Sequence, residues 1–154
     1  MKYICTLIAV KDIEKSKKFY HDILEQEVVA DLGANVILTG GFALQTSESW
    51  ASFIHKNYSE ISYGSNDAEL YFEEDDLDGF IEKLNKFDIE YVHPLKVHSW
   101  GQRVIRFYDL DKHIIEVGEN MAVVVKRFIG NGMTVEETAI RMDVPVDYVE
   151  AFLK

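Results

Sequence analysis

The feature that most constrains the fold of this chain is a repeat in its order of predicted elements. Residues 2–10 form an apolar run rich in β-branched residues, typical of a strand, and Asp12 follows where a helix N-cap is expected. Asp12 and Asp76 lie 64 residues apart (76 − 12), as do Cys5 and Glu69 (69 − 5). Two strand-to-helix units in one register favour two copies of a single supersecondary module.

Apolar residues recur at helical spacing after both aspartates, so each is expected to begin an amphipathic helix. The runs EVVADL, NVILT and FALQTS then indicate three strands, and Gly40-Gly41 predicts a two-residue hairpin between the last two. IEYVHPL, QRVIRFYD and HIIEVGE repeat the three strands, with DLDK as a turn. The sequence therefore predicts an α+β fold of paired βαβββ modules, about 1–47 and 68–119, whose sheets curve around a shared cavity. A partly helical connector, 48–66, joins them.

Beyond Glu119 the chain changes character, and residues 120–154 are expected to form a helical extension. Thr134 and Glu137 make a capping box, and Pro145 begins a further short helix. The arrangement is similar to a helix-turn-helix, but residues 121–154 carry four basic against five acidic residues. Because a helix that reads DNA is basic, a packing or dimer-closing tail is the favoured interpretation.

Charge and composition narrow the possible partners. A net charge of −11 disfavours nucleic acid and anionic membranes, because phosphate contacts need clustered Lys and Arg. No apolar run is long enough to span a bilayer, and the first residues become acidic too soon for a signal peptide. The single cysteine, Cys5, fits a reducing compartment. We therefore expect a cytoplasmic protein with a small-molecule ligand.

Two stretches resemble motifs of the vicinal oxygen chelate superfamily, which includes glyoxalase I, extradiol dioxygenases, methylmalonyl-CoA epimerase, fosfomycin-resistance transferases and bleomycin-resistance proteins. IAVKDIEKSKKFYHDIL is similar to its V-x-D-x-x-x-S-x-x-FY-x-x-x-L motif, and WGQRVIRFYDLDKHIIEVGE to its WG-x-R-x-x-x-F-x-DPDGH-x-IE motif. The resemblance spans roughly residues 1–119. In this chain Asp109-Leu110-Asp111-Lys112-His113 replaces DPDGH, so Pro and Gly are lost and the two acidic residues are kept.

The resemblance also nominates metal positions, since the first and last strands of each module supply one inward ligand in metal-using relatives. When the family motifs are aligned with this sequence, the resemblance puts these ligand positions at Cys5, Gln45, Glu69 and Glu116. No histidine is among them, which argues against a ring-cleaving dioxygenase with its two-His-one-carboxylate iron. Carboxylates and an amide suit Mg²⁺ or Mn²⁺, but a thiolate is an uncommon partner for them. We expect no cofactor or a weakly bound divalent metal.

Glu69 and Glu116 are candidate catalytic residues even without a metal. Two facing carboxylates can share a proton, which is one way to build a general base. Cys5 is expected to be a small core residue rather than a nucleophile.

The candidate substrate-binding residues are Trp100, Arg103, Tyr108 and His98. Aromatic walls hold an apolar ligand, and a guanidinium from Arg103, or alternatively Arg106, can bind its carboxylate or phosphate. Trp100 and Arg103 are the preferred pair. His93 is a second histidine near the expected cavity mouth, and His113 in the turn is expected to be structural.

These observations favour a glyoxalase/bleomycin-resistance-like small-molecule-binding protein with a degenerate metal site. The alternative is a metal-dependent lyase or isomerase of glyoxalase I type, in which a carboxylate moves a proton α to a carbonyl and the ion stabilises the enediolate. A regulatory or interaction module that uses the C-terminal helices is a third class. A homodimer is expected in each case.

Overall fold

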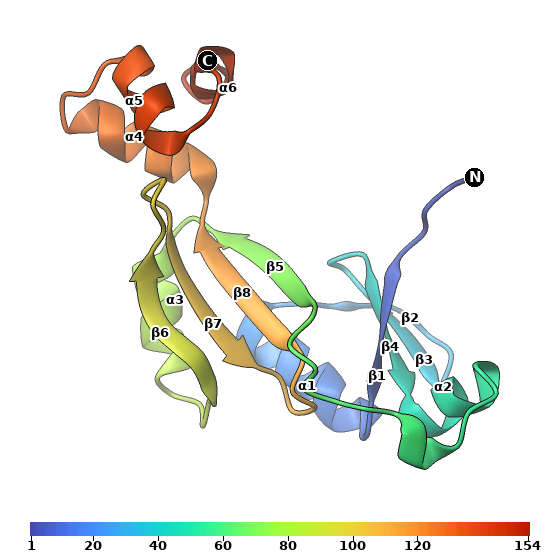
Figure 1. The fold of residues 1–154 in the computed structure, drawn as a ribbon. Coiled ribbons are helices and arrows are strands. Elements are labelled where there is room, and N and C mark those ends of the chain that lie inside the picture. Colours follow the sequence, from blue (N-terminus) through green and yellow to red (C-terminus); the bar gives the residue numbers. More distant parts are fainter. The chain divides into compact units, whose positions relative to one another are not determined.

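The computed structural model describes all 154 residues and contains two four-stranded sheets of the same topology (Figure 1). The strand orders are β1-β4-β3-β2 and β5-β8-β7-β6, with β1 parallel to β4 and β5 parallel to β8. The identical orders confirm the predicted repeat of a βαβββ module. The chain divides into two compact units, residues 1–68 with 109–113, and residues 69–108 with 114–154.

The first unit contains one sheet, one long helix and the connector to the second module. Its strands are β1 (Thr6–Val10), β2 (Val28–Asp31), β3 (Asn35–Leu38) and β4 (Phe42–Thr46). Its helices are α1 (Ile13–Leu24), α2 (Ser47–Phe53) and the 3-10 turn η1 (Tyr58–Glu60), so the connector is partly helical as expected.

Helix α1 begins where the sequence predicts, because Asp12 Oδ1 accepts a hydrogen bond from the Lys15 backbone N–H at 3.1 Å. Its buried face packs on the sheet, where Tyr20 meets Phe42 of β4 edge-on with ring centroids 5.1 Å apart. The face of β4 that carries Phe42 therefore lies against α1, and Ala43 and Gln45 point to the opposite face.

The hairpin between β3 and β4 differs from the two-residue turn expected from Gly40-Gly41. The loop has three residues, 39–41, and the Gly41 N–H donates to the Leu38 carbonyl at 3.1 Å. Gly41 has a φ of +77°, so the turn ends in a left-handed residue, the usual form of a three-residue hairpin.

The turn that joins β7 to β8, residues 109–113, belongs to the first unit. Asp109 Oδ2 accepts hydrogen bonds from the Tyr20 hydroxyl and from His113 Nδ1, both at 2.8 Å. Its Oδ1 accepts from the backbone N–H groups of Asp111 and His113 at 2.9 and 2.8 Å. Asp111 Oδ2 in turn accepts from the Lys11 backbone N–H at 3.0 Å. Both acidic residues of the turn motif are thus structural anchors.

Burial, followed by the negative charge of Asp109, raises the pKa of the Tyr20 hydroxyl well above its ordinary value. Lys112, which stands at the glycine position of the DPDGH motif, has a φ of +69°. A left-handed conformation costs a non-glycine residue about 1–2 kcal/mol, which the hydrogen bonds of Asp109 and Asp111 offset.

The second unit repeats the module and adds the C-terminal extension. Its strands are β5 (Glu69–Glu74), β6 (Tyr91–Val97), β7 (Arg103–Tyr108) and β8 (Ile114–Glu119), and its helices are α3 (Leu77–Leu84), α4 (Met121–Gly130), α5 (Val135–Met142) and α6 (Val146–Ala151). Asp76 caps α3 by accepting from the Gly79 N–H at 3.0 Å. Phe80 of α3 packs on Phe107 of β7, with centroids 6.4 Å apart, so α3 covers the face of the sheet that carries Phe107.

The C-terminal helices pack together around a small core of their own (Figure 1). The capping box of Thr134 and Glu137 is confirmed. Helix α4 lies within the helical extension expected for residues 120–154, and Asn120 caps it by accepting from the Ala122 N–H at 2.8 Å. None of the helices in the chain combines the length and apolar character that crossing a membrane would require.

Helix α4 holds the extension against the loop that precedes β7. Arg127 Nη2 donates to the Gly101 carbonyl at 2.9 Å and to Glu119 Oε2 at 2.7 Å. The ring of Phe128 lies where a Cβ on Gly101 would be, and Gly101 has a φ of +91°. Glycine is required there both by the backbone conformation and by this contact.

Candidate functional site

A row of polar side chains crosses the face of the second sheet that α3 does not cover. Side chains alternate along a strand, so Arg106, next to Phe107, points away from α3. Arg106 pairs in register with Glu116 on β8 and with His93 on β6. Glu116 pairs in turn with Tyr71 on β5. Four strands therefore each place one polar or aromatic residue in a single row, which we call the Arg106 row.

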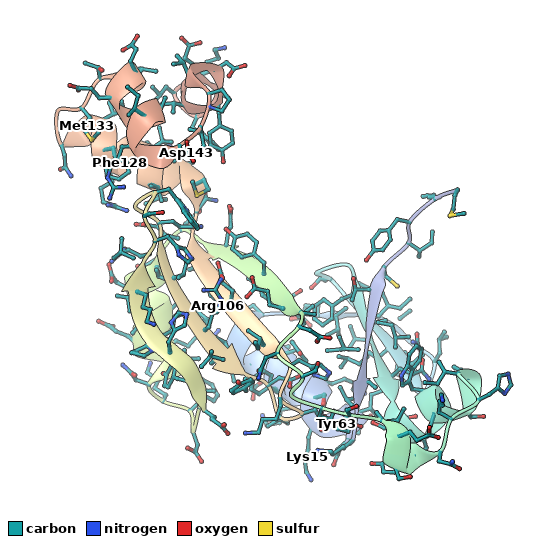
Figure 2. The ribbon with its side chains drawn as sticks, in the orientation of Figure 1. Lys15, Tyr63, Arg106, Phe128, Met133 and Asp143 are labelled. Atoms are coloured by element: carbon teal, nitrogen blue, oxygen red, sulfur yellow. The ribbon has the colours of Figure 1, made fainter.

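Arg106 is the centre of this row (Figure 2). Its Nε donates to Glu69 Oε2 at 2.9 Å, its Nη2 forms an ion pair with Glu116 Oε2, and its Nη1 lies 3.3 Å from His93 Nε2. Glu69 lies one pleat along β5 from Tyr71, on the same face. The two carboxylates predicted to face one another therefore both contact the same guanidinium.

The hydrogen bonds of His93 indicate its protonation pattern. Its Nδ1 lies 2.8 Å from the Pro94 carbonyl, which can only accept, so Nδ1 carries the proton. Because Arg106 can only donate, Nε2 is the acceptor of the Arg106 Nη1 hydrogen bond. The arrangement leaves Arg106 with three engaged N–H groups.

Glu116 is the most enclosed charged group of the row, with 4% of the residue exposed. Its Oε2 pairs with Arg106 but accepts no well-directed hydrogen bond. The Glu69 side chain is 36% exposed. A buried carboxylate oxygen that lacks a well-directed donor favours a further donor, such as one from a ligand.

An aromatic and amide group borders the row on the side of the C-terminal helices. The Trp100 ring stacks on His98 with centroids 4.1 Å apart, and Trp100 Nε1 donates to Gln102 Oε1 at 3.1 Å. Gln102 Nε2 donates to the Tyr71 hydroxyl at 2.9 Å. Burial, followed by the positive charge of Arg106, lowers the pKa of His98. His98 and Trp100 thus stand beside the row, where the sequence predicts ligand contacts.

Arg103, the arginine preferred from the sequence, lies on the other face. Its Nη1 donates to Asp78 Oδ1 of α3 at 2.9 Å, and its Nη2 donates to Glu119 Oε1 at 3.2 Å. Arg103 and Arg106 are three residues apart on one strand, so only one of them can share a face with Glu116. Tyr108 lies on the Arg106 face, two residues further along β7.

Comparison with known proteins places the chain in a family. A family profile described as a glyoxalase-like domain matches residues 3–122. The chain belongs to the glyoxalase-like domain family. A crystal structure of a protein of unknown function from Agrobacterium tumefaciens str. C58 is 39% identical, with a TM-score of 0.71 over 78% of this chain and 94% of that one. Among proteins with curated functions, none matches.

More distant structures share the glyoxalase-like fold. Lactoylglutathione lyase from Agrobacterium tumefaciens is 19% identical, with a TM-score of 0.58 over 78% of this chain and 94% of that one. The fosfomycin resistance protein FosX from Listeria monocytogenes, solved with Mn(II) and 1S,2S-dihydroxypropylphosphonic acid, is 18% identical, with a TM-score of 0.58 over 82% of this chain and 97% of that one. The family match over residues 3–122 confirms the vicinal oxygen chelate superfamily, and the structural likenesses confirm its α+β fold.

The side chains of the Arg106 row do not suit the divalent metal that the glyoxalase-like family implies. Neither unit brings together three or more His, Cys, Asp or Glu side chains in a geometry that could hold an ion. A cation that bound Glu69 and Glu116 together would have to displace the Arg106 guanidinium from both. Two carboxylates that share an arginine form an ion-pair network rather than a ligand set.

The two other metal candidates lie in the first unit. Cys5 directly precedes β1 and is half-buried. Gln45 is buried, and its amide donates to Ser49 Oγ and accepts from Asn35 Nδ2 at 2.8 Å. In the register of the repeat, Cys5 corresponds to Glu69. When the parallel strand pairs β1–β4 and β5–β8 are compared in that register, Ala43 rather than Gln45 occupies the position that corresponds to Glu116. The first module thus carries an apolar residue there.

Proposed function

We propose that this protein binds a small organic molecule at the Arg106 row, as a glyoxalase/bleomycin-resistance-like binding protein in which an arginine stands between the two carboxylates. The observation that carries the proposal is the contact of Arg106 with Glu69, Glu116 and His93. Because three side chains already fix the position of this guanidinium, it loses little conformational entropy when a ligand binds. The proposal includes a homodimer and a cytoplasmic location.

The unused hydrogen-bonding capacity of the row specifies the ligand. Arg106 has five N–H groups and engages three, so Nη1 and Nη2 can each still donate. Glu116 can still accept. A ligand that suits both carries a donor next to an acceptor, as a peptide amide or a hydroxy acid does, and an apolar or planar part for Trp100 and Tyr108.

Replacing Arg106 by glutamine is expected to weaken ligand binding by about tenfold to one hundredfold, because a charge-assisted hydrogen bond contributes about 1.5–3 kcal/mol. Bleomycin and other planar or peptidic antibiotics would be screened by thermal shift, and each hit titrated calorimetrically against both proteins. Arg103→Gln is the matched control, since it removes the same side chain from the other face of β7. A hit whose affinity is unchanged in Arg106→Gln binds elsewhere, and a screen in which every hit behaves in this way contradicts the proposal.

A metal-dependent lyase or isomerase is the second candidate, favoured by the carboxylates on one sheet face and by the similarity to lactoylglutathione lyase. Metal analysis by mass spectrometry, after dialysis against Mn²⁺, Ni²⁺ or Zn²⁺, separates the two functions. The binding-protein proposal expects well under one equivalent of metal in the native protein. Stoichiometric metal that is lost in Glu116→Gln would instead support the enzyme, and hemithioacetals would be the first substrates to assay.

A further inference from the structure

The first unit contains a cavity that is separate from the Arg106 row. Its volume is about 250 Å³, enough for a single-ring compound, and its lining residues are Leu7, Ile8, Ala9, Trp50, Ile61, Ser62, Tyr63 and His113. Apolar residues of β1 and aromatic rings make up most of the wall. Such a lining, with a few polar groups, is typical of sites for small aromatic molecules.

The most specific polar group in this wall is the His113 ring, which Asp109 orients. Asp109 is buried, with 2% of its side chain exposed, and its Oδ2 accepts from His113 Nδ1 at 2.8 Å. A carboxylate can only accept, so the proton of the neutral ring lies on Nδ1. His113 Nε2 is then an acceptor with no protein partner, on a ring that lines the cavity. A purely structural histidine needs no such free acceptor.

The neighbouring hydroxyl group of Tyr63, labelled in Figure 2, is already committed. Ser47 Oγ donates to the Val10 carbonyl at 2.8 Å, so the Tyr63 hydroxyl must be the donor in its short contact with Ser47. Lys11 Nζ lies 4.3 Å from the centre of the Tyr63 ring, on which it packs as a cation. The Tyr63 ring thus forms part of the wall and its hydroxyl proton is used, while His113 Nε2 is a ring nitrogen that can accept a hydrogen bond from a ligand.

We propose that this cavity is a second ligand site, which takes a small phenol whose hydroxyl group donates to His113 Nε2 while its ring packs among Trp50, Tyr63 and Leu7. The hydroxyl distinguishes the ligand from a plain hydrocarbon, because only the phenol satisfies the histidine. The site lies wholly within residues 1–68 and 109–113, so it does not depend on the function of the Arg106 row.

The test uses 4-fluorophenol and fluorobenzene as probes, with ¹⁹F NMR titration of the full-length protein. Wild-type protein is expected to bind 4-fluorophenol saturably and about tenfold more tightly than fluorobenzene, which lacks the donor. In His113→Phe this preference should fall to about twofold or less. The ¹⁵N signal of His113 Nε2 in wild-type protein should also shift when 4-fluorophenol is added.

Two controls locate the binding. His55→Phe changes an exposed histidine after α2 and should leave both affinities unchanged, whereas Trp50→Leu should weaken both probes. Arg106→Gln should retain phenol binding, which separates this site from the proposed function. No saturable binding of 4-fluorophenol, a preference that persists in His113→Phe, or loss of binding in Arg106→Gln would each overturn the proposal. Native NMR spectra of each variant confirm that it is folded.

Discussion

Replacing Asp109 by alanine is expected to lower the free energy of unfolding by about 3–5 kcal/mol, because its carboxylate is buried and accepts four hydrogen bonds. Alanine would leave the Tyr20 hydroxyl, the His113 ring and two backbone N–H groups without their acceptor. The cost is high because the Tyr20 hydroxyl belongs to a fully buried residue and cannot turn to water for a replacement acceptor. Urea unfolding of both proteins, followed by circular dichroism, measures the difference.

An exposed aspartate provides the comparison. Asp75→Ala, in the segment between β5 and α3, is expected to change the stability by no more than about 0.5 kcal/mol. A double-mutant cycle of Asp109→Ala with Tyr20→Phe should show a coupling energy of about 0.5–3 kcal/mol. A loss below about 1 kcal/mol in Asp109→Ala would show that the turn is not anchored to α1 in the way described.

Replacing Glu119 by alanine is expected to destabilise the second unit by about 3–5 kcal/mol, because it leaves two arginines without their shared carboxylate. The Glu119 side chain is 1% exposed. Its Oε1 accepts from Arg103 Nη2 at 3.2 Å and its Oε2 from Arg127 Nη2 at 2.7 Å. Since Arg127 belongs to α4, the loss should be largest where the C-terminal helices meet the sheet.

Hydrogen exchange distinguishes this local effect from a uniform one. Amide protons of α4 in Glu119→Ala should exchange faster relative to those of α1, which belongs to the other unit. Glu150→Ala, at an exposed position of α6, is the matched control and should leave both helices unchanged. Equal acceleration in α1 and α4 would contradict the proposed role of Glu119 in holding the extension.

Local signals in the sequence were sufficient for the architecture. Asp12, Asp76 and the Thr134 capping box begin helices by contacts within three residues, so the sequence alone locates them. The repeat spacing and the turn motif likewise led to the family, which the match over residues 3–122 confirms. Helix α4 lies within the helical extension expected for residues 120–154. Its valines favour a strand locally, and packing against Gly101 and the other terminal helices overrides that preference.

The composition of the site depended on strand register, which no local pattern specifies. Alternation along β7 shows that Arg103 and Arg106 point to opposite faces, but only the register between β7 and β8 decides that Arg106 is the one that shares a face with Glu116. The pairing of β1 with β4 puts Ala43, rather than Gln45, in the place that corresponds to Glu116.

The sequence by itself determined the repeated βαβββ module, its helix starts and its family, because these follow from residues close together in the chain. The tertiary structure alone decided that Arg106 joins the two glutamates and that Asp109 orients His113 towards a cavity. Glu69 and Arg106 are 37 positions apart and Tyr20 and Asp109 are 89 apart. Contacts over such separations form only when strands pair in one register and helices pack on one face.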